Sequence, residues 1–170
     1  MKRSAVRAAV VVGSLAALVL GSASSQAQMK IGTGDPVADR QRLMKLNGAS
    51  WKDVQDKVKA GQFEAVAVNA ETMALNAEHI PSLFPKGSLT DKSKAKPEIW
   101  QKWSEFDAAT KNYAMQAEKL RDAARTKDLA ATEAVAKEFG RQACGSCHTP
   151  FRVPPPQQQA PAPPQQQPTR

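Results

Sequence analysis

The C-terminal part of the chain contains Cys144, Cys147 and His148 within the sequence Cys-Gly-Ser-Cys-His. This Cys-x-x-Cys-His spacing is the one used for covalent attachment of c-type haem. Residues three and four apart lie on one side of a helix, so both sulfurs and the imidazole face the same way. Two thioether bonds and one axial imidazole can therefore come from a single turn. The motif predicts one covalently bound haem c, with His148 as a ligand of its iron.

Other chemistries also use closely spaced cysteines. A zinc site needs four ligands, but His79 is the only other histidine and the chain has no third cysteine. A thioredoxin-like pair belongs near a β-α-β unit, and no segment shows the alternation typical of strands. A disulfide, or a haem-free helical protein that uses the pair as a thiol switch, remains as an alternative. Haem attachment is favoured because the motif agrees with an export signal and a helical context.

The N-terminus has the layout of a secretory signal peptide. Lys2, Arg3 and Arg7 precede an apolar run over residues 8–20, and small residues follow it as far as Ala27. Thirteen helical residues span about 20 Å, less than the roughly 30 Å of a bilayer core. We therefore expect cleavage after Ala27, export to the periplasm and no stable membrane anchor.

Charge and composition exclude several classes of partner. The chain has 24 Lys+Arg and 16 Asp+Glu, and removing the three basic residues of the signal peptide lowers the formal net charge from +8 to +5. Acidic and basic residues interleave along every segment, whereas nucleic-acid binding needs a clustered basic face with aromatic residues. We therefore expect no nucleic-acid partner.

Apolar residues recur at steps of three and four over four stretches, at about residues 36–60, 62–80, 97–124 and 128–148. An irregular stretch at 81–96, with two prolines and a glycine, separates the second from the third. This pattern predicts an all-α, antiparallel up-down-up-down four-helix bundle over residues 28–152. Residues 153–170 are rich in Pro and Gln and predict a disordered tail.

A second iron ligand is predicted on the first helical stretch, whose start lies beside the end of the last helix in such a bundle. Met44 faces inward about 12 Å along this helix, and its alternative role is a gap-filling core methionine. Arg40, one turn earlier, is predicted to contact a haem propionate, because a buried cation needs a partner. His79 is the rival ligand, although a histidine at a helix end more often complements the helix dipole.

Residues 36–152 resemble the class II c-type cytochromes, the cytochrome c′ family. The resemblance rests on Arg40-Gln41, on Pro-Glu-Ile-Trp at 97–100 and on Cys-x-x-Cys-His-x-x-Phe-Arg ending at Arg152. Members with a non-ligating residue in the first helix are five-coordinate, high-spin and bind nitric oxide or carbon monoxide. Members with Met there are six-coordinate and low-spin. Met44 falls at this position, so the resemblance implies the low-spin branch.

These observations predict a periplasmic electron carrier and not an enzyme, because His148 and Met44 fill both axial positions. Ligation by a thioether raises the reduction potential of the iron. The alternative is a five-coordinate gas-binding cytochrome c′ in which Met44 only lines the distal pocket. The expected partners are a redox protein and a second copy of the chain, since many relatives pair through their first two helices. Trp51 is the candidate interface residue for such a dimer, and its alternative role is that of a core residue.

Overall fold

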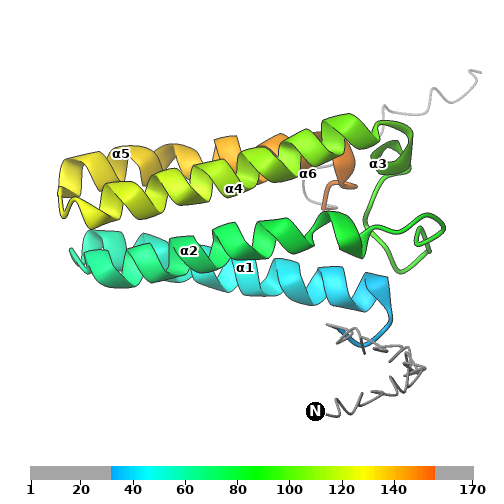
Figure 1. Cartoon of the computed structure of the whole chain (residues 1–170), viewed down its shortest axis with the longest axis horizontal. Helices are drawn as coiled ribbons and strands as arrows, with labels where there is room; N and C mark the ends of the chain where they lie inside the picture. Colours follow the sequence, from blue (N-terminus) through cyan, green and yellow to red (C-terminus); the bar gives the residue numbers. More distant parts are fainter. Residues whose placement is uncertain (1–31, 156–170) are drawn as a thin grey trace, which may run out of the picture.

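The computed structural model describes residues 32–155, and four long helical segments of this part form an antiparallel bundle (Figure 1). They are α1 (Pro36–Lys59), α2 (Phe63–His79), α4 (Trp103–Arg125) and α5 (Leu129–Phe139), which continues through η2 (Gly140–Gly145) into α6 (Ser146–Phe151). The predicted all-α four-helix bundle is confirmed. The predicted signal peptide and almost all of the predicted tail lie outside the described residues. Among residues 32–155, no helix combines the length and apolar character needed to cross a membrane.

Local signals in the sequence account for the position of α1. The Asp35 carboxylate accepts hydrogen bonds from the backbone N–H groups of Val37 and Ala38, at 2.9 and 3.3 Å. Pro36 occupies the first helical turn, where its missing N–H is not needed. Gly61 has a φ of +66°, and this left-handed conformation turns the chain directly into α2. These signals place Arg40 and Met44 in the first turns of a well-defined helix.

The closest helix pair in the bundle is α2 with α4, whereas α1 and α5 pack much less extensively. Both helices of this pair bury small side chains, among them Ala70 and Ala77 on α2 and Ala117 and Ala124 on α4. Side chains of this size let two helix backbones approach. The bundle is therefore tight on one side and more open between α1 and the last helix.

The third predicted helix is interrupted, which corrects the expectation of one continuous stripe. A short helix α3 (Glu98–Gln101) ends at Lys102, whose φ of −121° and ψ of 49° are not helical, and α4 begins at the next residue. A continuous helical stripe through this stretch would have turned Trp103 toward the core, whereas after the break it is 41% exposed. Trp100 takes an inner position instead, and its indole N–H donates to the Phe84 carbonyl at 3.0 Å.

The segment before α3 is joined to the end of α6 by backbone hydrogen bonds. Ala95 and Arg152 form an isolated antiparallel bridge. On either side of it, the Lys96 N–H donates to the Phe151 carbonyl and the Val153 N–H donates to the Lys94 carbonyl, each at 2.9 Å. This pairing fixes the predicted irregular loop against the end of the helix that carries the Cys-x-x-Cys-His motif.

Candidate functional site

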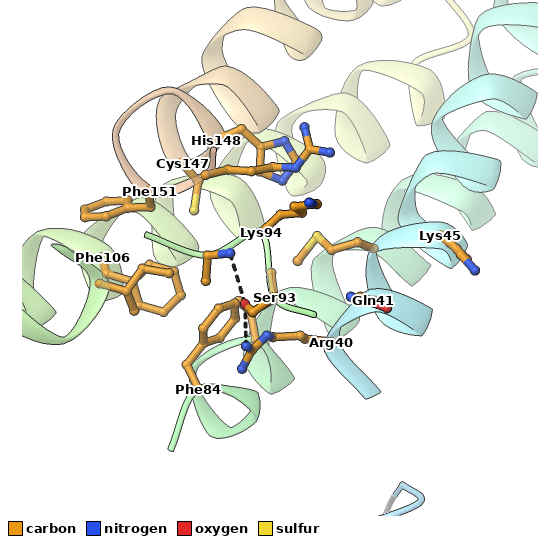
Figure 2. A pocket seen from close by; sticks show the side chains of 15 residues that line it. Arg40, Gln41, Lys45, Phe84, Ser93, Lys94, Phe106, Cys147, His148 and Phe151 are labelled. Carbon is orange, nitrogen blue, oxygen red and sulfur yellow. Dashed lines mark hydrogen bonds between the residues drawn. The ribbon is translucent and has the colours of Figure 1, made fainter. Parts of the chain in front are cut away.

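A cavity of about 480 Å³ opens at the end of the bundle where α1 begins and α6 ends (Figure 2). This volume lies within the roughly 300–1,000 Å³ that is usual for ligand and cofactor pockets. The cavity is lined by side chains of α1, the 80–96 loop, α3, α4 and the last helix: Arg40, Gln41, Met44, Lys45, Ile80, Phe84, Ser93, Lys94, Ala95, Ile99, Phe106, Cys147, His148, Phe151 and Arg152.

The structure brings four of the five predicted site residues to this one cavity. Cys147 and His148 lie on one side and Arg40, on α1, lies across from them (Figure 2). Met44 is half-buried and also lines the cavity from α1. Cys144 does not line it, although it packs against the hydrophobic core as Cys147 does. The predicted convergence of the first helix and the end of the last helix is therefore present.

The Cys-x-x-Cys-His motif does not lie on a regular α-helix as predicted. Cys144 and Gly145 belong to the π-helical segment η2, and α6 starts at Ser146. Single π-helical turns inside α-helices are rare and frequently mark functional sites. The change of helical period occurs within the motif itself, so it alters the direction in which Cys144 points relative to Cys147.

Asn112, a residue that the sequence interpretation did not single out, holds this π-helical segment in place. Its side-chain amide on α4 donates to the Gln142 carbonyl at 2.7 Å and to the Ser146 hydroxyl oxygen at 3.1 Å. The Ser146 hydroxyl in turn donates to the Ala143 carbonyl at 2.9 Å. The only sequence signal for this role is a polar residue on a helix otherwise rich in apolar and charged ones, which is too weak to identify it.

Electrostatics at the motif favour neutral side chains. His148 is exposed where it lines the open cavity, but neighbouring protein atoms still remove part of its hydration. This burial, and secondly the charge of Arg152, lowers the pKa of His148 from its ordinary value. Burial raises the pKa of Cys144, and burial with the nearby Cys144 raises the pKa of Cys147 to about 11. At neutral pH the imidazole therefore keeps a free nitrogen lone pair for a metal, and both thiols keep their protons.

Arg40 is 4% exposed, and the loop provides its hydrogen-bond acceptors. Its two terminal nitrogens donate to the Leu83 carbonyl (3.2 Å), the Ser88 hydroxyl (2.9 Å), the Ser88 carbonyl (2.7 Å) and the Ser93 hydroxyl (2.7 Å). The guanidinium also lies 4.7 Å above the ring of Phe84. The propionate contact was predicted because a buried cation needs a partner. The oxygen atoms of the loop already act as partners of Arg40, so this reason no longer applies. Direct contact of Arg40 with a propionate stays a prediction.

Replacing Arg40 by methionine is expected to release the loop from α1 and to lower the free energy of unfolding by about 2–4 kcal/mol, because buried oxygen acceptors lose a charged donor. Trypsin should then cut faster after the exposed Lys86 and Lys92. Arg42 provides the matched control: it is exposed and pairs with Asp39 at 3.5 Å, so its methionine variant should lose at most about 1 kcal/mol. Chemical denaturation and timed proteolysis measure both effects. Equal stability and equal cleavage of the two variants would show that Arg40 does not anchor the loop.

His79, the rival iron ligand, is exposed at the end of α2 and is not among the residues that line the cavity. Its ring therefore does not share the cavity with His148. The zinc alternative also lacks a ligand set, since residues 32–155 contain no group of three or more His, Cys, Asp or Glu side chains placed to hold a metal ion.

The cavity has the chemistry of a site for haem. Its walls include the aromatic rings of Phe84, Phe106 and Phe151, which suit an apolar macrocycle. A histidine nitrogen and a methionine sulfur, both of which are ligands of haem iron in c-type cytochromes, open into it. Its lining also contains four cationic side chains and no carboxylate, which suits the two carboxylates of a haem.

Comparisons with known proteins find cytochromes. The family model described as cytochrome C′ matches residues 35–152. A cytochrome c-556 of Agrobacterium tumefaciens is 31% identical over 120 residues, which cover 69% of this chain and 96% of the relative. A cytochrome c-554 of Cereibacter sphaeroides is 39% identical over 113 residues, covering 65% and 80%. The crystal structure of cytochrome c′ from Rubrivivax gelatinosus has a TM-score of 0.61 and 26% identity, covering 71% of this chain and 96% of that one.

Proposed function

Since the chain belongs to the cytochrome c′ family, whose cofactor is covalently bound haem c, we propose that this monohaem cytochrome is a periplasmic electron carrier with His148 and Met44 as axial ligands. The observation that carries the proposal is that both side chains line one cavity, one from α6 and one from α1. The predicted signal peptide at residues 1–27 supports export. With both axial positions filled, no open position remains for a substrate, so we expect no enzymatic turnover.

Each wall of the cavity has a distinct role in this function. When bound, haem supplies a one-electron Fe(III)/Fe(II) couple. The neutral imidazole of His148 and the thioether of Met44 would hold the iron, and methionine ligation would favour the reduced state. Cys147 on the wall of the cavity and Cys144, which lies outside its lining, would hold the porphyrin through thioether bonds. Phe84, together with the other lining rings, excludes water and lowers the local dielectric constant.

Absorption spectra of the oxidised and reduced protein, before and after addition of carbon monoxide, test this function. An electron carrier with both ligands in place should be low-spin in both redox states, and carbon monoxide should leave its spectrum unchanged. A high-spin spectrum with rapid carbon monoxide binding would instead support the gas-binding cytochrome c′, in which Met44 is only a pocket residue.

Besides a redox protein, a second copy of the chain is a proposed partner. Trp51, the predicted interface residue, is half-buried, and its ring centroid lies 4.7 Å from that of Phe139 on α5. It therefore belongs to the interior between α1 and α5. Apolar side chains that are more than half exposed occur instead at Leu46 on α1 and at Val68 and Leu75 on α2. These residues are better candidates for pairing through the first two helices.

Light scattering at micromolar concentration is expected to give the mass of a dimer, because association would cover these apolar side chains. Leu75→Glu should shift the mass toward that of a monomer, since it places a charge in the interface. Met115→Glu is the matched control, because Met115 is equally exposed on α4. A monomeric mass for the wild-type protein would contradict the dimer.

A further inference from the structure

The rim of the cavity carries an excess of positive charge. Lys45 on α1, Lys94 in the loop and Arg152 after α6 are all exposed and line the cavity, and Arg40 lies buried beneath them. These cations come from segments far apart in the sequence. No Asp or Glu is among the lining residues. The cavity therefore opens through a ring of cations, and its opening has a positive electrostatic potential.

These cations also lack the ion pairs that neutralise many others on the helices. Away from the cavity, Lys52 pairs with Asp56, Lys111 with Asp107, and Arg121 with Glu71 and Asp122. Within residues 32–155, no ion pair involves Lys45, Lys92, Lys94 or Arg152. Residues 84–96 contain four lysines, including Lys94, and only one aspartate.

The backbone holds this part of the loop in place from two sides. The Lys92 carbonyl accepts a hydrogen bond from the side-chain amide of Gln41 on α1 at 3.1 Å. The Lys94 carbonyl accepts from the Val153 N–H at 2.9 Å. Both lysines therefore have a fixed place at the opening (Lys94 and Gln41 are labelled in Figure 2), although their side chains are exposed to solvent.

The cofactor alone does not account for this charge. A haem has two carboxylates, whereas four cations line the cavity and Lys92 stands beside them. From this excess, and resting on the proposed electron-carrier function, we infer that the cavity opening, defined by Lys45, Lys92, Lys94 and Arg152, is the docking surface for an acidic redox protein. Opposite charges accelerate the encounter and orient the two proteins so that the opening faces the partner.

The test uses the haem-loaded protein and an oxidised plant-type [2Fe–2S] ferredoxin as a strongly acidic probe. Binding is measured by NMR chemical-shift titration at ionic strengths from about 10 mM to about 500 mM, a range over which surface charges become screened. The wild-type affinity should fall steeply with salt. Lys92→Glu, at a residue of the opening that does not line the cavity, should weaken binding at low salt by about threefold to tenfold. At high salt this difference should disappear.

Lys119→Glu is the control, because it makes the same charge change on the exposed surface of α4, about 24 Å along the helix from its start. Its effect at low salt should be less than half that of Lys92→Glu. Binding that is independent of salt, or equal effects of the two variants, would overturn the docking surface.

Electron transfer separates this inference from the function on which it rests. Stopped-flow mixing with the reduced ferredoxin, and with the small cationic reductant hexaammineruthenium(II), should reduce the haem in both cases. The ferredoxin rate should fall and the ruthenium rate should rise as salt is added. Reduction by both reagents without these opposite trends would overturn the docking surface alone. Failure of both reagents to reduce the haem would overturn the carrier function and the docking surface together.

Discussion

Replacing Met44 by leucine is expected to turn a low-spin cytochrome into a high-spin one. The substitution keeps most of the side-chain volume and removes only the thioether, so the fold should lose less than about 1.5 kcal/mol. The variant should lose any methionine-to-iron charge-transfer band and bind carbon monoxide. Its reduction potential should fall by about 0.1 V or more, a fraction of the roughly 0.8 V range that axial ligands cover. Absorption spectroscopy and redox titration measure these changes.

Met73→Leu is the control for this experiment, because Met73 is fully buried in α2 and is not among the cavity-lining residues. The same substitution there should leave the spin state and the potential unchanged. If the wild type is already high-spin and binds carbon monoxide as fast as the Met44 variant, Met44 is not a ligand. The gas-binding function would then replace electron transfer.

The second large effect concerns the covalent bonds to the cofactor. A double variant, Cys144→Ala with Cys147→Ala, is expected to lose all of its haem to acidified acetone, whereas the wild type keeps it. Each single variant should retain haem through one remaining thioether bond. Absorption of the extracted and precipitated fractions measures retention. Haem that leaves the wild-type protein in acidified acetone would contradict covalent attachment.

The same cysteines distinguish a cytochrome from the alternative thiol switch. The thiolate is the reactive form, and burial keeps the pKa values of Cys144 and Cys147 above the ordinary value. Both thiols therefore keep their protons at pH 7. Alkylation of the haem-free chain by iodoacetamide should be slow at this pH and should accelerate as the pH rises toward about 11, the pKa of Cys147. Rapid alkylation at pH 7 would favour the switch.

Much of the architecture could be predicted from the sequence because its signals are local. The steps of three and four that mark buried faces predicted the helices, and the prolines and glycine of residues 81–96 predicted the irregular stretch between the second and the third. Antiparallel order follows from connections that are short apart from the loop before α3. This order was enough to expect Met44 and His148 at the same end of the bundle, where the structure shows both lining one cavity.

Two features of the site depended on contacts that no local pattern contains. The acceptors of the Arg40 guanidinium lie 43 to 53 residues away in an irregular loop, so the sequence suggested only that a buried cation required a partner. The π-helical turn at the motif is held by Asn112, 30 residues from the Gln142 carbonyl that it binds. Helical periodicity alone gave no sign of this turn.

The sequence by itself therefore determined which residues are available for chemistry: a motif typical of covalent haem attachment, the histidine that ends it and a methionine on the first helix. These are properties of residue type and short spacing, which survive in any arrangement of the helices. Tertiary structure alone decided how Arg40 satisfies its charge, how the loop is fixed to α6 and which lysines surround the opening. Hydrogen bonds between distant segments decide these features, and such partners become defined only once the chain has folded.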